Sequence, residues 1–196
     1  MTLICIVRHG ETDWNAQGKL QGKTDISLNQ NGIVQANECK NTLSSNDWDL
    51  IITSPLKRAK ETAEIINTEM KAPLIEMEDF IERSFGDAEG MTESERTTAF
   101  PDKNYSNQED RISFSKRVIK GIEKINELYQ GKKIILVAHG AVINAILTHF
   151  SNGEIGSGKT RLLNACMSNI VFIEEQWKIQ DYNQIDHLSQ YNKEGI

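Results

Sequence analysis

Residues 134–140 read Ile-Ile-Leu-Val-Ala-His-Gly, and residues 3–10 read Leu-Ile-Cys-Ile-Val-Arg-His-Gly. In each stretch, an apolar run of strand length ends at a histidine that is followed by glycine. A continuous apolar run is typical of a strand that a parallel sheet buries on both faces. The two stretches therefore predict two strands of a parallel sheet, each ending in the same short polar phrase.

Strand-like and helix-like segments alternate along the rest of the chain. Further strands are expected at 49–53, 73–75, about 163–173 and 177–182, and helices at about 33–43, 54–70, 109–129 and 141–149. Ser54 and Pro55 are expected to supply the N-cap and the first-turn proline of the second helix. The alternation predicts an α/β fold, a three-layer sandwich with a mostly parallel central sheet flanked by helices.

The length of 196 residues and the globular composition, with 38% hydrophobic and 26% charged residues, predict a single domain over residues 1–196. Residues 78–108 are polar and lack apolar periodicity. They are expected to form a small excursion over one edge of the sheet and over the active site. No pattern in the sequence predicts an oligomeric state.

The net charge and the spacing of the cysteines argue against several classes of partner and site. A net charge of −6 argues against a nucleic-acid partner, because binding phosphates along a duplex needs a basic face. No apolar run approaches the ~20 residues of a membrane span, and the first one stops at Arg8 and His9, so no membrane partner or signal peptide is expected. Cys5, Cys39 and Cys166 lack metal-ligand spacing, which favours reduced thiols in a cytoplasmic protein and no metal site.

The candidate chemistry gathers at the strand ends. Ligands of open parallel sheets bind beyond the carboxyl ends of the strands, where His9 and His139 are expected. Arg58 falls in the first turn of a predicted helix, where a cation opposes the helix dipole unless an anion lies there. Arg8, His9, Arg58 and His139 would together create a strong positive potential. A tetrahedral dianion such as a phosphoryl group fits that potential.

The phrases that carry these residues resemble the histidine phosphatase superfamily, in its phosphoglycerate mutase-like branch with an Arg-His-Gly motif. They arrive in the family's order and cover residues 4 to about 146. The matching phrases are Val7–Thr12 with Trp14 and Asn15, Leu20–Asp25 with Leu28 and Gly32, Thr53–Ala59, Glu82–Gly90, and Val137–Gly140.

The resemblance implies a phosphomonoester phosphatase that works without a metal or other cofactor on a small phosphorylated substrate. It implies that His9 is the nucleophile and forms a phosphohistidine, and that Glu82 is the general acid and then the general base. It also implies a phosphate site, made by Arg8, Asn15, Arg58, His139 and Gly140, with Gln21 and Gly22 as secondary candidates.

Elementary chemistry agrees with these roles. An imidazole nucleophile must be neutral, and nearby guanidinium groups favour that form by charge repulsion. Arginines also bind phosphoryl oxygens in a fork geometry, so cationic side chains can take the electrostatic role of a metal. The choice of proton donor is more open than the choice of nucleophile. Glu11, Asp87 and Glu89 are alternatives to Glu82 in this respect.

Two other functions of the family stay open. A cofactor-dependent phosphoglycerate mutase is the alternative, although mutases have a longer, more basic insertion after the general acid, as the resemblance has it. Here residues 91–111 hold five acidic and three basic residues, and Phe85 stands where mutases tend to have tyrosine. A non-catalytic domain that binds phosphorylated ligands is more remote, because every core position of the motif set is present.

Two further patterns are weighed against these functions. Residues 153–160 fit the phosphate loop G-x-x-x-x-G-K-[ST], but they follow an expected helix and precede a strand-like segment, so a glycine-rich loop is expected instead. Four apolar side chains of the excursion could line a leaving-group pocket or could only pack the excursion onto the domain. These are Phe85, Met91, Phe100 and Tyr105.

Overall fold

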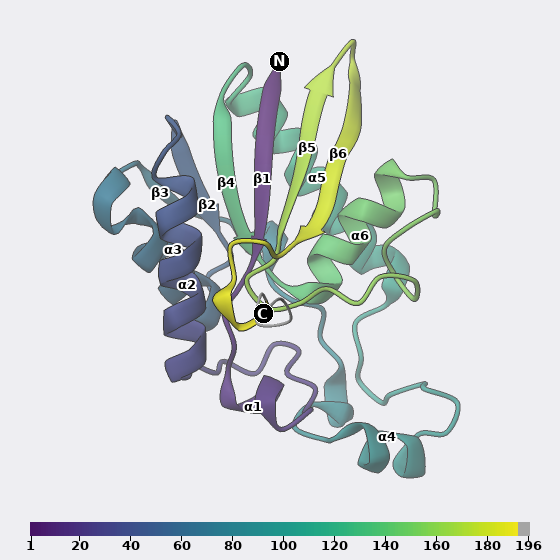
Figure 1. Ribbon diagram of the computed structural model, residues 1–196. Helices are drawn as coiled ribbons and strands as arrows, with labels where there is room; N and C mark the ends of the chain where they lie inside the picture. Colours follow the sequence, from purple (N-terminus) through teal and green to yellow (C-terminus); the bar gives the residue numbers. More distant parts are fainter. Residues whose placement is uncertain (192–196) are drawn as a thin grey trace.

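A six-stranded sheet forms the centre of the computed structural model, which describes residues 1–191 (Figure 1). The strand order is β3-β2-β4-β1-β5-β6. The strands are β1 (Thr2–Arg8), β2 (Leu50–Thr53), β3 (Leu74–Glu76), β4 (Lys133–Ala138), β5 (Met167–Ile173) and β6 (Gln176–Gln184). The first four strands in this order pair in parallel, and β5 and β6 pair antiparallel. The expected mostly parallel sheet is therefore confirmed, with an antiparallel pair at one edge.

The register of β1 against β4 brings the two polar phrases together. Leu3 pairs with Lys133, and Arg8 pairs with Ala138 at the other end of the ladder. Both strands therefore end at the same level, so His9 and His139 emerge side by side at the carboxyl edge of the sheet.

Helices cover both faces of the sheet. They are α1 (Asp13–Ala16), α2 (Gln30–Leu43), α3 (Lys57–Met70), α4 (Glu93–Ala99), α5 (Arg111–Leu128) and α6 (Gly140–Phe150), with 3-10 turns η1 (Glu78–Phe80), η2 (Gly86–Ala88) and η3 (Ser189–Tyr191). Alternate residues of β1 and β4 contribute to two apolar clusters, one shared with α5 and α6 and the other with α2 and α3. This two-sided burial explains why both strands are apolar without interruption.

The start of α3 differs from the expectation. Its N-cap is Leu56, whose side chain makes no capping bond, so Ser54 and Pro55 precede the helix. The first helical N–H, that of Lys57, instead donates to the carboxylate of Asp25, which lies in a loop distant in sequence, at 2.8 Å. The Ser54 hydroxyl oxygen accepts from the N–H of Leu56 at 3.3 Å and also contacts a histidine described below.

Two smaller expectations have different outcomes. The helix expected at about 33–43 begins earlier, at Gln30, and Ala36, Cys39 and Leu43 are buried in it whereas Ile33 is 39% exposed. Residues 153–160 form turns after α6 and open no helix, as expected for a glycine-rich loop. The sequence pattern did not predict the four-residue helix α1, which is too short to show periodicity.

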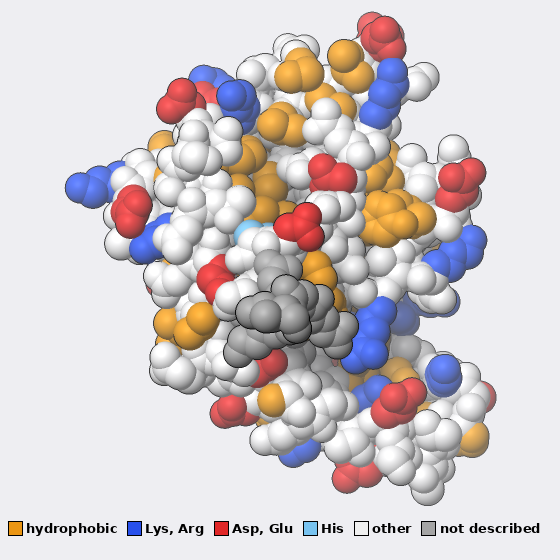
Figure 2. Space-filling model, viewed as in Figure 1, with side chains coloured by type: hydrophobic (Ala, Val, Ile, Leu, Met, Phe, Trp, Pro, Cys, Tyr) orange, Lys and Arg blue, Asp and Glu red, His pale blue; other side chains and the backbone are white. Residues whose placement is uncertain are grey.

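On the face shown in Figure 2, acidic and basic side chains are interspersed among polar ones. Within residues 1–191, no helix has the length and apolar character needed to span a membrane. In the same range, no three His, Cys, Asp or Glu side chains are grouped so as to hold a metal ion.

Candidate active site

His9 follows β1 and is buried, with 2% of its surface exposed. Its Nδ1 atom lies 2.7 Å from the carbonyl oxygen of Gly10. A carbonyl oxygen only accepts hydrogen bonds, so Nδ1 carries the proton and Nε2 keeps its lone pair. The ring centroids of His9 and His139 lie 5.2 Å apart.

His139 is the N-cap residue of α6 and is fully buried. Its Nε2 atom lies 2.7 Å from the hydroxyl oxygen of Ser54, the residue after β2. Strands β2 and β4 are neighbours in the sheet, so their ends place this pair together. The Ser54 contact fixes the ring through one nitrogen and leaves the other, Nδ1, for the site.

Arg8 and Arg58 are anchored by backbone carbonyl groups. Arg8 Nη1 donates to the carbonyl of Leu162 at 2.6 Å. Arg58, from the first turn of α3, donates to the carbonyls of Gly22 and Thr24 at 2.7 and 2.9 Å. Burial lowers the pKa of Arg58 to about 10, so its guanidinium stays charged at neutral pH.

Three buried nitrogen atoms of this group have no hydrogen-bond partner within residues 1–191. They are Arg8 Nε, Arg58 Nε and His139 Nδ1, half of the six such atoms in that part of the chain. A buried donor without a partner costs free energy, and more so on a charged group. The two guanidinium N–H groups therefore point to an anion as the complementary ligand, and His139 Nδ1 adds a third donor in the tautomer in which Ser54 donates to Nε2.

The electrostatics of both histidines favour the neutral ring. Burial, and then the charges of Arg58 and Arg8, hold the pKa of His9 well below its ordinary value. Burial and the charge of Arg58 likewise hold the pKa of His139 well below its ordinary value. A neutral His9 with a free Nε2 lone pair is a competent nucleophile.

Glu82 lies in the loop after η1 and is 8% exposed. Its carboxylate accepts hydrogen bonds from the N–H groups of Ala141 and Arg83, at 3.1 and 2.9 Å. Burial raises the pKa of Glu82, while these two bonds and the charges of Arg58 and Arg8 oppose the rise. The contact with Ala141 ties the carboxylate to the start of α6, next to His139.

The remaining predicted site residues surround these groups. Asn15 Oδ1 accepts from Thr12 N and Asn164 Nδ2, both at 3.1 Å, which leaves the amide nitrogen of Asn15 as its outward donor. Gln21 is buried and its Oε1 lies 2.9 Å from the Thr12 hydroxyl. Two glycines complete the set. Gly22 supplies a carbonyl to Arg58 from a backbone with φ of +56°, and a Cβ at Gly140 would lie 3.7 Å from Arg8 Nε.

Comparison with known proteins places this geometry in a family. The model of the histidine phosphatase superfamily, branch 1, matches residues 4–185. The chain belongs to the histidine phosphatase superfamily.

Two of the most similar named relatives are phosphatases, and other relatives in the superfamily are phosphoglycerate mutases. The chain is 53% identical to "Uncharacterized phosphatase PhoE" of Bacillus subtilis over 193 residues, which cover 98% of this chain and 100% of that protein. It is 32% identical to a metal-independent phosphoserine phosphatase of Arabidopsis thaliana, over 96% of this chain and 84% of the relative. The predicted family and enzyme class, a phosphatase, are therefore confirmed.

Solved structures agree on the fold. A phosphoserine phosphatase mutant of Entamoeba histolytica, in complex with phosphoserine, matches with a TM-score of 0.84 and 31% identity, over 96% of this chain and 100% of that one. Bacillus stearothermophilus YhfR matches with a TM-score of 0.89 at 23% identity, over 95% and 99% of the two chains. The three-layer α/β sandwich is the fold that they share.

The other carboxylates considered as proton donors are held in different contacts. Glu89 accepts from the N–H groups of Lys23, Thr24 and Phe85 at 3.1, 3.0 and 2.9 Å, and hydrogen bonds that include these lower its pKa. Glu11 accepts from two asparagine side chains, and exposed Asp87 accepts from a third. Glu82 is the most buried of the four carboxylates.

Sequence reasoning missed several residues that hold this superfamily site together. Ser54 orients His139, and Asn164 donates to the His9 carbonyl at 3.2 Å as well as to Asn15. Thr62 accepts from the Gly10 N–H and donates to the Arg58 carbonyl, which links β1 to α3. Asp25 caps α3 and so relieves part of the conflict between Arg58 and the helix dipole. No sequence pattern identifies Asn164 as a site residue, because it lies outside the motif phrases.

Proposed function

We propose that the protein hydrolyses small phosphomonoesters through a phosphohistidine intermediate on His9. The observation that carries the proposal is the set of three unpartnered buried nitrogens, on Arg8, Arg58 and His139, beside a neutral imidazole. Those donors suit the non-bridging oxygens of a phosphoryl group.

In the first step, the Nε2 lone pair of His9 attacks phosphorus and the bond from phosphorus to the leaving oxygen breaks. Glu82 gives its proton to that oxygen. Its raised pKa supports this role, because a general acid has to be protonated at the start of the cycle.

In the second step, water attacks the phosphorus of the phosphohistidine. Glu82, now a carboxylate, accepts a proton from that water, and the bond from phosphorus to Nε2 breaks. Inorganic phosphate, neutral His9 and protonated Glu82 are the result. Splitting the reaction this way replaces one difficult displacement by two easier ones.

Throughout both steps, Arg8, Arg58 and His139 bind the equatorial oxygens, and the amide nitrogen of Asn15 adds a neutral donor. Anchoring by carbonyl groups supports preorganised guanidinium groups, which stabilise developing charge without having to move. Gly140 keeps space open at Arg8, and Gln21 and Gly22 support the phosphate site from the loop. The proposal assigns the charge stabilisation to these side chains and includes no metal or other cofactor.

Residues 78–108 are proposed to lie over this site as an excursion of a single domain, expected over residues 1–196, of which 192–196 lie outside the described residues. Support comes from Glu82 within the excursion and from Glu89, whose carboxylate joins it to residues 23–24. Edge-to-face contacts of Tyr105 with Phe85 and Phe100 favour a packing role for these rings.

The proposed substrate is a small phosphorylated metabolite, in agreement with the relatives named for phosphoserine. A cytoplasmic location is part of the proposal, and three free, buried cysteine thiols support it.

Release of phosphate from an aryl phosphomonoester in excess chelator tests the proposal, with wild type and His9→Ala compared. Turnover that survives the chelator and is lost in the variant is expected. An inert wild type, or a His9→Ala variant as active as wild type, would overturn the hydrolytic mechanism and bring the mutase or the binding domain forward.

A further inference from the structure

The loop that carries Glu82 is held from outside the phosphate site by an ion pair between a residue of α5 and a residue just before that helix. Arg117 and Glu109 form this pair, with Nη2 3.0 Å from both carboxylate oxygens and Nε 3.2 Å from Oε1. The two side chains are 25% and 19% exposed, so solvent screens them less than an ordinary surface pair. Neither residue belongs to the motif phrases of the sequence.

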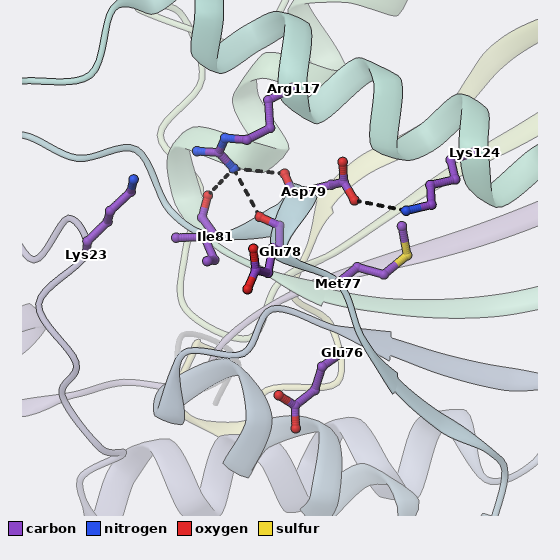
Figure 3. Close-up of a pocket in the computed structure, with 8 residues that line it drawn as sticks. All are labelled: Lys23, Glu76, Met77, Glu78, Asp79, Ile81, Arg117 and Lys124. Carbon is purple, nitrogen blue, oxygen red and sulfur yellow. Dashed lines mark hydrogen bonds and ion pairs between the residues drawn. The ribbon is translucent and has the colours of Figure 1, made fainter.

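The remaining donor of Arg117 binds the backbone that leads into Glu82. Its Nη1 atom donates to the carbonyls of Asp79 and Ile81, both at 2.9 Å, and lies 3.5 Å from that of Glu78 (Figure 3). The Asp79 and Ile81 carbonyls lie at the end of η1, where a cation satisfies groups that the turn itself leaves unpaired, whereas the Glu78 carbonyl also accepts from the Ile81 N–H at 3.1 Å. The chain is therefore fixed at Ile81, the residue before Glu82.

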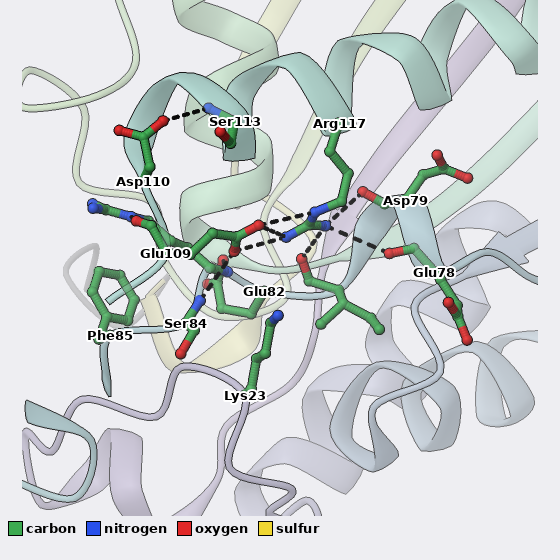
Figure 4. A network of polar contacts seen from close by, with 12 residues as sticks. Lys23, Glu78, Asp79, Glu82, Ser84, Phe85, Glu109, Asp110, Ser113 and Arg117 are labelled. Atoms are coloured by element: carbon green, nitrogen blue, oxygen red, sulfur yellow. Dashed lines mark hydrogen bonds and ion pairs between the residues drawn. The ribbon is translucent and has the colours of Figure 1, made fainter. Parts of the chain in front are cut away.

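Glu109 binds the backbone that leaves Glu82. Its Oε2 atom accepts from the N–H of Ser84 at 3.3 Å, and its carbonyl accepts from Arg83 Nε at 3.0 Å (Figure 4). Asp110, the N-cap of α5, accepts from the N–H of Ser113 and thereby holds Glu109 at the start of the helix. The ion pair thus binds the backbone on both sides of Glu82.

The residues packed beneath the ion pair restrict the movement of Arg117 and of the turn that it binds. The Arg117 guanidinium lies 5.1 Å from the ring centroid of Phe114, a buried residue of the apolar core. Gly121, one turn further along α5, leaves room for Asp79 and Phe80, since a Cβ there would lie 2.7 and 2.9 Å from their side chains. The turn η1 is therefore seated directly on α5, which in turn packs against the sheet.

We propose that Arg117 and Glu109 are positioning residues that hold the Glu82 carboxyl in reach of the leaving oxygen. The inference rests on the proposed role of Glu82 as the general acid. Neither residue touches the phosphoryl group. Their effect falls on the two steps that use Glu82, but only the first depends on the leaving group, and kcat/KM reports that first step.

The dependence of kcat/KM on the leaving group distinguishes a positioning role from a general loss of structure, because a general loss of structure would lower kcat/KM equally for all leaving groups. An alcohol leaves only with a proton, whereas a nitrophenolate leaves without one, so a misplaced acid harms alkyl phosphates selectively. In Arg117→Ala, we expect kcat/KM for an alkyl phosphate to fall about a hundredfold and that for p-nitrophenyl phosphate to fall less than about fivefold. Lys124→Met is the matched control, because Lys124 lies on the same helix and its one ion pair within residues 1–191 is with the Asp79 carboxylate, at 3.7 Å.

Chemical rescue adds a second readout. Arg117 lines an open cleft of about 550 Å³, which gives a small cation access to the position of its side chain. Millimolar guanidinium is expected to restore alkyl phosphate turnover in Arg117→Ala and to leave Lys124→Met unchanged. Arg117→Lys is expected to recover only partly, since one ammonium cannot bind two carbonyls and both carboxylate oxygens together.

Glu82→Gln separates this inference from the proposed function. If Glu82→Gln shows the selective loss and Arg117→Ala shows an equal loss on both substrates, or none, the positioning role is wrong and Glu82 stands. If Glu82→Gln lowers kcat/KM equally for both substrates, the proposed proton-donor role of Glu82 is wrong, and the positioning role that rests on it is wrong as well. If Arg117→Ala does not fold, Glu109→Gln tests the inference instead. We expect a smaller selective loss of kcat/KM for the alkyl phosphate in this variant. An equal loss on both substrates, or none, would overturn the inference.

Discussion

The Nδ1 atom of His9 lies 2.7 Å from the carbonyl oxygen of Gly10, and this contact decides which ring nitrogen can react. The opposite tautomer would set a nitrogen lone pair against a carbonyl lone pair in a buried site, without the hydrogen bond. The ring is therefore held in one tautomer, with Nε2 unprotonated before any substrate arrives. The turn that follows β1 therefore preorganises the nitrogen that acts as nucleophile in the proposed mechanism.

The pH dependence of alkyl phosphate hydrolysis is the first prediction. In the proposed mechanism, activity needs neutral His9 and protonated Glu82. The pKa of His9 lies below its ordinary 6.5 and that of Glu82 above its ordinary 4.5. We therefore expect kcat/KM to fall on the alkaline side as Glu82 ionises and on the acid side as His9 gains a proton. Profiles from about pH 4 to 9 measure both limbs.

Glu82→Gln is the control for this profile. It is expected to abolish the alkaline limb that belongs to Glu82, while the ionisation of the substrate itself affects both proteins alike. An alkaline limb of the same shape and midpoint in the variant would show that another group supplies the proton.

Replacing Ser54 by alanine tests the orientation of His139. The hydroxyl lies 2.7 Å from His139 Nε2, and its loss frees the ring to rotate. We expect a loss of about 1 to 2 kcal/mol of transition-state stabilisation, which is roughly a five- to thirtyfold fall in kcat/KM. Ser168→Ala is the control, because Ser168 is also buried but accepts its hydrogen bond from Asn183. Equal losses in the two variants would contradict a specific role for Ser54.

Replacing Glu89 by glutamine tests the link between the two loops beside the phosphate site. The carboxylate accepts N–H bonds from Lys23, Thr24 and Phe85, and an amide would turn a donor toward some of them. We expect a loss of about 1 to 2 kcal/mol in the free energy of unfolding and a higher KM, with the alkaline limb unchanged. Urea unfolding and steady-state kinetics measure these effects.

The sign of the pH effect on stability follows from the lowered pKa of Glu89. Its stabilisation is present above the unfolded pKa and is lost as the pH falls through the folded value, so wild type and Glu89→Gln should converge in acid. Glu95→Gln, which alters a cap of the short helix α4, is expected to leave KM unchanged. A shifted alkaline limb in Glu89→Gln would make Glu89 the proton donor instead of Glu82.

The sheet and its site-bearing ends could be predicted because they depend on local signals. Apolar runs that end at His9 and His139 identify buried parallel strands, and adjacent strands bring their ends together whatever the intervening sequence. The same reasoning misplaced the start of α3. Ser54 has the residue type of an N-cap, but its hydroxyl is bonded to His139, and Asp25 caps the helix from 32 positions away.

The supporting contacts could not be predicted because they join distant segments. Asn164 reaches His9 across 155 positions, and Arg117 reaches Ile81 across 36. No spacing rule relates such pairs, since both partners lie on loops or helix faces whose positions depend on the packed fold. Asparagine and arginine are also common on protein surfaces, so neither residue stands out in the sequence.

Trapping the phosphorylated protein tests the central claim most directly. Glu82→Gln should accept phosphorus from an aryl phosphate, which needs no proton donor, and then hydrolyse slowly because no base activates water. With labelled phosphorus and an alkaline quench, we predict one acid-labile, alkali-stable label per chain, located on His9 and absent from a Glu82→Gln/His9→Ala double variant. A label on another residue, or turnover with no labelled protein at any time, would contradict the phosphohistidine mechanism.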